Sequence, residues 1–311
     1  MSRFLLHGLV IETDFAVAAQ QTEREPDLVC TYELDPWSSA PTGGTELARS
    51  TSDGEVTMRV LAQHGAHVVE WPGFMRARVQ PEGAVSRVTF SVADLANEAL
   101  VPVLLSPAVG AMAMLRGALV LHATAVIVDG KAVLLLADRG GGKSSIAALL
   151  CSAGAALLAE DVCALVIVDG MPMAYAGVQE LRLRTTSPWL ADLQGLQRSV
   201  DHLDGRAVVA PSRSTMPVVP LGAVLVVGLD RSVDTAVVLP LAAIQFVHAL
   251  MAAQRCPASL TSSVIRSAFG TAGSCADSVP AGVLTVPWAA EYRHRPLGRE
   301  IKTLLETVVR R

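Results

Sequence analysis

The segment LLLADRGGGKSS, residues 134–145, joins an apolar run to three consecutive glycines, a lysine and two serines. Glycine has no Cβ, so three glycines in a row allow successive backbone N–H groups to point into one concavity. The residues that follow, 144–153, have the pattern of a helix, whose N-terminus carries a partial positive charge. The order of strand, glycine-rich turn and helix predicts a loop that binds phosphate groups.

Within this loop, each polar residue type suits one part of a nucleoside triphosphate. Lys143 is predicted to contact the β- and γ-phosphates, and the Ser144 hydroxyl is predicted to bind Mg²⁺. The usual pattern of such a loop begins with glycine, whereas this chain has Ala137 there. One added methyl at the end of a strand should be tolerated. A flexible connector is the alternative, and the strand and helix on either side argue against it.

Two adjacent carboxylates, Glu160 and Asp161, end the next strand pattern at residues 155–161, after Gly154, where the helix is expected to stop. In an α/β sheet, ligands bind at the carboxyl ends of the strands. One carboxylate there can hold Mg²⁺, and the other can accept a proton from an attacking hydroxyl. A solvated turn would also explain the pair.

The remaining patterns predict an α/β fold in two parts. Asp129-Gly130 and Asp169-Gly170 predict tight hairpins, because both residue types accept positive φ angles. Further strands are expected at 222–228 and 235–239, a buried helix at 241–253 and a last helix at 297–310. Together they indicate a core domain over residues 116–311.

A small, mostly antiparallel β module with a connecting helix is expected over residues 1–115. Its strands are predicted at 56–61, 66–70, 74–79 and 87–90, where apolar and polar residues alternate. Residues 35–55, rich in Ser, Thr, Gly and Pro, predict a surface loop. Helical segments are expected from residue 91, broken near Pro102 and Pro107.

Composition restricts the class of protein. The chain has 311 residues, of which 51% are hydrophobic and 17% charged, as in a well-buried globular protein. A net charge of −4 gives no broad basic field, which argues against nucleic-acid binding. The apolar stretch 101–128 is interrupted by prolines, Arg116 and His122, which argues against a membrane span. Five scattered cysteines without a C-x-x-C pair predict reduced thiols in the cytoplasm and no zinc site.

Residues 119–165 resemble the catalytic core of the HPr kinase/phosphorylase family. They are most similar to its serine kinases that modify precursor peptides, including lasso-peptide precursors. The resemblance covers residues 116–190 well, including a looser pattern over 176–190, and the rest of the chain only by pattern. The matching positions are His122, Asp138, Gly140, Gly142, Lys143, Ser144 and Asp161, with Glu160 at the first acid of the pair. The resemblance implies a P-loop core that transfers a phosphoryl group from ATP or GTP, with Mg²⁺, to a serine hydroxyl.

The resemblance also implies roles for individual residues. Glu160 would be the base, although the family usually has aspartate there, so Asp161 could take that role instead. Asp161 and Ser144 would bind the metal, and His122, which alone would suggest a core histidine, would orient the acid pair. The nucleotide-binding set comprises Asp138, Arg139, Gly140, Gly141, Gly142, Lys143, Ser144, Ser145 and Arg182.

Arg182 and Arg184 alternate with two leucines, so they are either the polar face of a strand or contacts to the nucleotide.

The implied partner is a precursor peptide, or a small carrier protein, that bears the acceptor serine. The family's carrier-protein kinases are oligomeric, so a homo-oligomer is left open. Two alternatives remain. One is an HPr-type carrier-protein kinase/phosphorylase, which LRLRTTS at residues 181–187 disfavours because it lacks the glycines of the family's corresponding loop. The other is a nucleotide-binding regulatory module without transferase activity.

Overall fold

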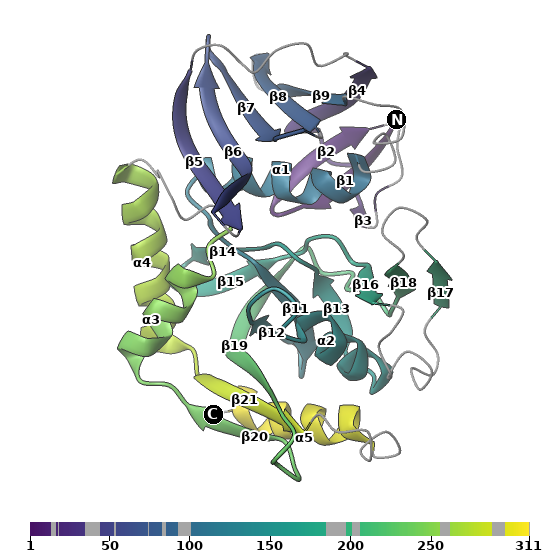
Figure 1. The fold of residues 1–311 in the computed structure, drawn as a ribbon, viewed down its shortest axis with the longest axis vertical. Helices are drawn as coiled ribbons and strands as arrows, with labels where there is room; N and C mark the ends of the chain where they lie inside the picture. Colours follow the sequence, from purple (N-terminus) through teal and green to yellow (C-terminus); the bar gives the residue numbers. More distant parts are fainter. Residues whose placement is uncertain are drawn as a thin grey trace.

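The protein is a mixed α/β structure built on two nine-stranded sheets, one above the other in Figure 1. The computed structural model describes residues 1–13, 17, 19–34, 44–52, 54–73, 75–82, 85–92, 101–184, 197–200, 206–255, 262–287 and 296–310. In these parts of the chain, no helix is long and apolar enough to cross a membrane.

The N-terminal sheet has the strand order β3-β1-β2-β4-β9-β8-β7-β6-β5 and is mostly antiparallel, as expected. The exceptions are the β2–β4 and β4–β9 pairs, which are parallel. Its strands are β1 (Ser2–Leu6), β2 (Leu9–Thr13), β3 (Gln20–Gln21), β4 (Leu28–Leu34), β5 (Thr45–Ser52), β6 (Glu55–Gln63), β7 (Ala66–Trp71), β8 (Met75–Glu82) and β9 (Val85–Val92).

One part of the predicted surface loop is a strand. Residues 35–43 lie outside the described residues, but Thr45–Ser52 form β5, which pairs antiparallel with β6 along its length. Ser and Thr favour turns when isolated, yet Thr also suits a strand, and the ladder to β6 satisfies the backbone groups. The expectation of a loop across 35–55 was therefore wrong for this segment.

Helix α1 (Val101–Leu115) is continuous, contrary to the break expected at Pro102 and Pro107. Pro102 is in the first turn, where the missing N–H has no helical partner to lose. Pro107 lies inside the helix and removes one hydrogen bond, but the buried residues from Leu105 to Met114 anchor both halves in the core. The expected helical residues 93–100 lie outside the described part.

Helix α1 connects the two sheets through a shared hydrophobic core. Leu105 and Val109 share one hydrophobic core with Phe4 and Val60 of the upper sheet and with Val162 and Ala164, which belong to the lower half. Figure 1 shows the helix between the two sheets. The N-terminal β unit is thus packed on the rest of the chain through apolar contacts.

The second sheet has the order β10-β14-β15-β19-β12-β11-β13, with β21 and then β20 added beside β19. The β12–β19 and β19–β21 pairs are parallel. Its strands are β10 (Leu119–Leu121), β11 (Ala123–Val128), β12 (Lys131–Leu136), β13 (Ala156–Ala159), β14 (Cys163–Val168), β15 (Met171–Tyr175), β19 (Val218–Asp230), β20 (Val237–Pro240) and β21 (Ala281–Pro287). A separate small sheet contains β16 (Leu181–Arg184), β17 (Gln197–Val200) and β18 (Arg206–Ala210).

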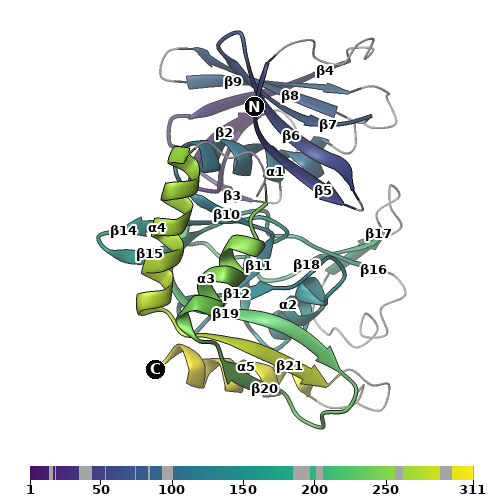
Figure 2. The ribbon, with the colours of Figure 1, turned by 60° about the vertical axis from the view of Figure 1, so that its left-hand side comes forward.

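Helices cover both faces of this sheet (Figure 2). On one face, α2 (Lys143–Ser152) and α5 (Leu297–Val309) pack on Val133 and Leu135; on the other, α3 (Ala243–Ala252) and α4 (Ser262–Ser278) pack on Ala132 and Leu134. Neighbouring residues of β12 thus face opposite helical layers, as the alternation of a strand requires. The result is a three-layer α/β core.

The local turn signals were correct. Asp129 and Asp169 have φ angles of 51° and 50°, and the glycines after them have 74° and 78°, as a two-residue hairpin requires. Gly154, with φ 94°, ends α2. The N–H of Gly154 donates to the Cys151 carbonyl, and that of Ala155 donates to the Leu150 carbonyl, which is the Schellman arrangement.

The C-terminal third was predicted less well. Helix α5 is confirmed, with its buried residues spaced four apart, but the helix expected to be buried, α3, buries only Phe246 and Leu250 within the described chain. Ile244 of α3 is 76% exposed. Helix α4 and strand β21 were missed. Helix α4 buries mostly small residues such as Ala268 and Ala272, which give a weak apolar pattern.

The contact between α2 and α5 gives a test of the fold. A Cβ on Gly298 would overlap the Leu149 carbonyl oxygen, whereas a Cβ on Gly273 would meet no atom within 4 Å. Gly298→Ala should lower the free energy of unfolding by about 1–3 kcal/mol, because overpacking displaces a helix. Gly273→Ala, the matched control in α4, should leave it unchanged or raise it by up to about 1 kcal/mol. Urea unfolding measures both; equal effects would contradict this packing.

Candidate functional site

The glycine loop lies between β12 and α2, in the predicted order of strand, turn and helix. Gly140 and Gly142 have φ angles of 81° and 93°, and Gly142 is the N-cap of α2. A Cβ on Gly142 would lie 2.9 Å from Leu229 Cδ1. No side chain caps this helix in the described structure, so its first N–H groups stay available to an anion.

The alanine at the start of the loop is accommodated by Gly141. A Cβ on Gly141 would lie 2.8 Å from the Ala137 methyl and 3.1 Å from the Asp138 carbonyl oxygen. The Ala137 methyl therefore occupies space that the missing side chain leaves open. The substitution of alanine for the usual glycine is compatible with the turn.

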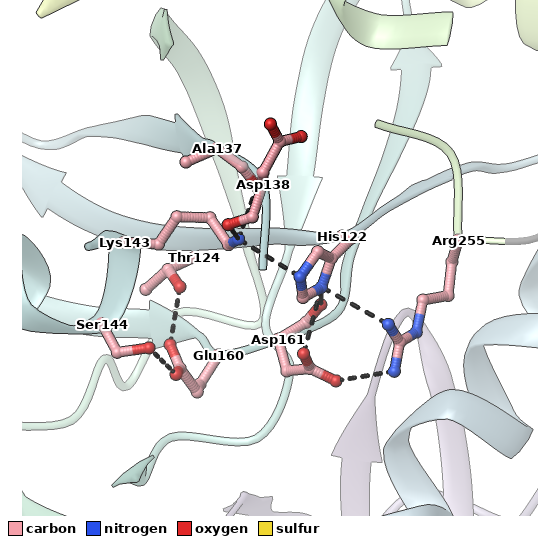
Figure 3. Close-up of polar contacts among 9 residues, drawn as sticks. All are labelled: His122, Thr124, Ala137, Asp138, Lys143, Ser144, Glu160, Asp161 and Arg255. Atoms are coloured by element: carbon pink, nitrogen blue, oxygen red, sulfur yellow. Dashed lines mark hydrogen bonds and ion pairs between the residues drawn. The ribbon is translucent and has the colours of Figure 1, made fainter. Parts of the chain in front are cut away.

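Lys143 lies over the loop and is buried (Figure 3). Its Nζ donates to the carbonyl oxygens of Ala137 at 2.7 Å and Asp138 at 3.3 Å, and lies 3.2 Å from His122 Nε2. Burial lowers the pKa of Lys143, while the charges of Asp161 and Glu160 act in the opposite direction. The ammonium group thus lies between the loop carbonyls and His122, which in turn contacts Asp161.

Glu160 is buried and held by two hydroxyl groups. Ser144 Oγ donates to its Oε1 at 2.5 Å, and Thr124 Oγ1 donates to its Oε2 at 2.7 Å. Burial raises the pKa of Glu160 to about 7, although both hydrogen bonds and the charge of Lys143 favour the ionised form. The carboxyl group is therefore joined directly to the hydroxyl predicted to bind metal.

Asp161, the next residue, has a different environment. Its side chain is 46% exposed and its backbone has φ 63°, a left-handed conformation that aspartate tolerates. Oδ1 lies 3.1 Å from His122 Nδ1, and Arg255 Nη2 donates to Oδ2 at 3.0 Å. Burial alone would raise the pKa of Asp161, but Arg255 and His122 outweigh it and hold the pKa well below its usual range.

Sequence reasoning missed two members of this cluster, Thr124, which bonds Glu160, and Arg255, which pairs with Asp161. Arg255 follows α3, and its N–H donates to the Val120 carbonyl, while the His122 N–H donates to the Ala253 carbonyl. These bonds fix the end of α3 beside β10 and bring the guanidinium to Asp161. The residue belongs to no motif and lies far from Asp161 in the sequence, so only the fold places it.

The structure brings together five of the predicted residues, His122, Lys143, Ser144, Glu160 and Asp161, with the loop. Asp138 and Arg139 are exposed on the loop and Ser145 is in the first turn of α2. Of the two arginines in β16, Arg184 lies near the loop, since its Nη2 is 3.6 Å from where a Cβ on Gly140 would be. A nucleotide contact by Arg182 stays a prediction, and residues 185–190 lie outside the described part.

Neither a protein-family model nor a curated protein matches the sequence. One solved structure that the chain resembles is the HPr(Ser) kinase/phosphatase from Coxiella burnetii. The two are 13% identical, and the superposition covers 60% of this chain and 94% of that chain with a TM-score of 0.32. A likeness at this level does not show what the protein does.

The environment of Glu160 predicts a pH dependence of stability. Its pKa is about 7 in the folded protein and 4.5 for the free side chain, so the folded state binds the proton more tightly between these values. The protein should lose stability as the pH rises from about 4.5 to 7, and Glu160→Gln should remove this loss. Melting temperatures of both proteins at pH 5 and 8 measure it. Groups other than Glu160 titrate in both proteins, so subtracting the change in melting temperature of the variant from that of the wild type leaves the contribution of Glu160. Equal changes in melting temperature in the two proteins would contradict the prediction.

Proposed function

We propose that this protein is a nucleoside-triphosphate- and Mg²⁺-dependent kinase that phosphorylates a serine hydroxyl of a precursor peptide, of the lasso type, in a cytoplasmic peptide-modification pathway. The observation that carries the proposal is the cluster itself: a bare glycine turn and its lysine are joined to two carboxylates in different environments, to Glu160 through Ser144 and to Asp161 through His122. Serine as the acceptor and the peptide substrate rest on the resemblance of residues 119–165. ATP and GTP suit the loop equally.

The loop fits the phosphates of a nucleotide. Side chains at Gly141 and Gly142 would collide with neighbouring atoms, so the turn keeps its backbone bare. The unpaired N–H groups at the start of α2 favour an anion, and Lys143 supplies a positive charge beside them. Arg184, near Gly140, can add a second cation at the outer side of the loop.

The residues present also fit Mg²⁺. Mg²⁺ in phosphoryl-transfer sites is usually held by one or two protein side chains together with waters and substrate phosphates. Ser144 and Glu160, which are in direct contact, are such a pair, and no set of three or more His, Cys, Asp or Glu side chains in the described structure is arranged for a metal. When bound, the ion would neutralise charge on the phosphates.

The different exposure of the two carboxyl groups supports different roles for them. Glu160 is enclosed by two hydroxyls, whereas Asp161 is half-exposed and can reach an acceptor hydroxyl from outside. A general base must first be within reach of the proton, and its pKa matters second. We therefore propose Glu160 for the metal side, in place of the Asp161 that the resemblance implies, and Asp161 for the acceptor. The serine oxygen bonds to the γ-phosphorus as the bond from that phosphorus to the bridging oxygen breaks and the nucleoside diphosphate leaves, the serine proton passes to an Asp161 oxygen, and Lys143 holds the phosphates.

A nucleotide-binding regulatory module is the second candidate. It is favoured by the ion pair that holds Asp161, since a carboxylate with a low pKa is a weak base. Phosphoryl transfer has a loose transition state, however, in which orientation of the acceptor matters more than base strength. Transfer of phosphate to a peptide would support the kinase, and nucleotide binding without transfer would support the regulatory module.

Lys143→Ala should abolish tight nucleotide binding and reduce transfer about 100-fold or more, because a charge aimed at the transferred phosphate is lost. Lys302→Ala, which removes a surface lysine paired with Glu306, is the matched control and should behave as the wild type. Binding of a fluorescent ATP analogue and phosphopeptide formation, measured by mass spectrometry over a panel of serine-containing precursor peptides, test the prediction. Wild-type nucleotide affinity in Lys143→Ala would refute it; binding without transfer to any peptide would favour the regulatory module.

Arg255→Gln should shift the acid limb of the kcat–pH profile to higher pH. The guanidinium holds the pKa of Asp161 down, so its removal raises the pH at which Asp161 becomes ionised. Arg255→Lys should restore part of the shift, and Asp161→Asn should remove the limb together with most of the rate. If Arg255→Gln lowered the rate by the same factor at every pH, Arg255 would have a purely structural role.

A further inference from the structure

A cavity of about 550 Å³ lies away from the glycine loop, where four elements meet. They are the β1–β2 turn, the end of α1, the β14–β15 hairpin and helix α4. Figure 2 shows α4 beside β14 and β15, with α1 next to its upper end. None of the lining residues belongs to the loop or the acid pair. The volume is in the range of pockets that hold small organic ligands, about 300–1,000 Å³.

The walls of the cavity combine apolar surface with one positive charge. Leu9, Ala113, Val166 and Ile167 supply apolar side chains, and Arg116 supplies a guanidinium group. Among the described residues that line the cavity, none is acidic. A ligand with an apolar body and a negative group would match this lining.

Several polar groups at the cavity have no partner within the described chain. Arg116 is exposed, and no described carboxylate pairs with it; the hydroxyls of Tyr175 and Thr271 make no hydrogen bond to any described residue. Thr271 is buried nonetheless. Polar groups placed around a cavity without partners are typical of a binding site, because a ligand can satisfy them.

His7 adds a fully buried polar atom. It is 1% exposed, and its Nε2 lies 2.8 Å from Ser106 Oγ, while its Nδ1 has no hydrogen-bond partner among the described residues. Burial lowers the pKa of His7 to about 4, so the ring is neutral at pH 7 and can donate or accept one hydrogen bond at Nδ1. An unpaired buried polar atom costs about 1–3 kcal/mol, and Nδ1 is too enclosed for a ligand in the cavity to contact it directly.

We propose that this cavity binds a carboxylate group attached to an apolar body, with Arg116 pairing with the carboxylate and the four apolar side chains enclosing the body. The planar guanidinium matches a carboxylate by two parallel hydrogen bonds. A phosphate dianion fits less well, because a single arginine would leave one negative charge unpaired beside an apolar wall. A free carboxylic acid and the C-terminal residue of a peptide both present this chemistry.

Occupancy of the cavity should stabilise the junction between the two halves of the protein. The His7 N–H donates to the Ala176 carbonyl at 2.8 Å. A Cβ on Gly177 would lie 2.9 Å from both His7 Cε1 and Ala159 Cβ, so the His7 ring lies one contact away from the residue before Glu160. A bound ligand would link α1 and α4 to this turn and raise the melting temperature.

The test uses matched acid and amide probes on the whole chain. Hexanoate and hexanamide represent the free acid, N-acetyl-leucine and N-acetyl-leucinamide represent a peptide terminus, and inorganic phosphate is the control anion. Calorimetric titration should show saturable binding of at least one acid, with a rise in melting temperature, and at least tenfold weaker binding of its amide. Tighter binding of hexanoate would identify a free carboxylic acid as the natural ligand, and tighter binding of N-acetyl-leucine would identify the C-terminal residue of a peptide.

Variants locate the binding. Arg116→Gln should weaken the acid at least about tenfold, and Thr271→Val should weaken it less, whereas Arg266→Gln, an exposed arginine of α4 that does not line the cavity, should have no effect. Nucleotide binding, measured in each variant, should stay unchanged, which separates this site from the phosphate loop and shows that the variants fold. Equal affinity for acid and amide, competition by phosphate, no saturable binding of either acid, or wild-type affinity in Arg116→Gln would overturn the proposal.

Discussion

The close approach of bare backbone at the glycine turn is the constraint on which the rest of the site depends. Ala137 and Leu229 occupy the space that side chains at Gly141 and Gly142 would need. Because the turn closes this tightly, α2 begins directly at Lys143, and its first residues project toward β13. The hydrogen bond between Ser144 and Glu160 then fixes the loop helix against the strand that carries the acid pair. A Cβ at either position would force the turn or its neighbours to shift.

Two carboxyl groups adjacent in the sequence have acquired opposite acid–base properties. Glu160 is enclosed by protein and accepts only from neutral hydroxyls, so its pKa rises, whereas Asp161 meets a guanidinium and its pKa falls. Such a divergence is common where two acids perform different tasks. The left-handed backbone at Asp161 is what turns its side chain away from that of Glu160 and toward Arg255. Backbone conformation, more than residue type, therefore gives the two carboxyl groups different surroundings.

The N-terminal sheet contributes to the organisation of the core. Helix α1 belongs to the residues predicted as a separate module, yet its buried face packs simultaneously on the upper sheet and on β14. The β1–β2 turn reaches into the same junction, where His7 contacts Ser106 and the segment beside β13. A division at residue 115 separates the strand patterns, but the hydrophobic core extends across it. The cavity lies along this shared boundary.

The sequence by itself determined the hairpins, the glycine turn, α2 and α5, because each depends on local chemistry: positive φ angles, caps and a strand–turn–helix order. It also predicted that Lys143, Ser144, Glu160 and Asp161 lie together, because ligands bind where the strands of an α/β sheet end. It did not determine β5, the continuity of α1, the exposure of α3 or the existence of α4 and β21. In those segments long-range pairing and packing outweigh local preference, and small buried residues weaken the pattern. Arg255 and Arg184 reach the site only because β10, α3 and β16 are brought beside the loop. The cavity, likewise, is formed by four elements that no local pattern connects.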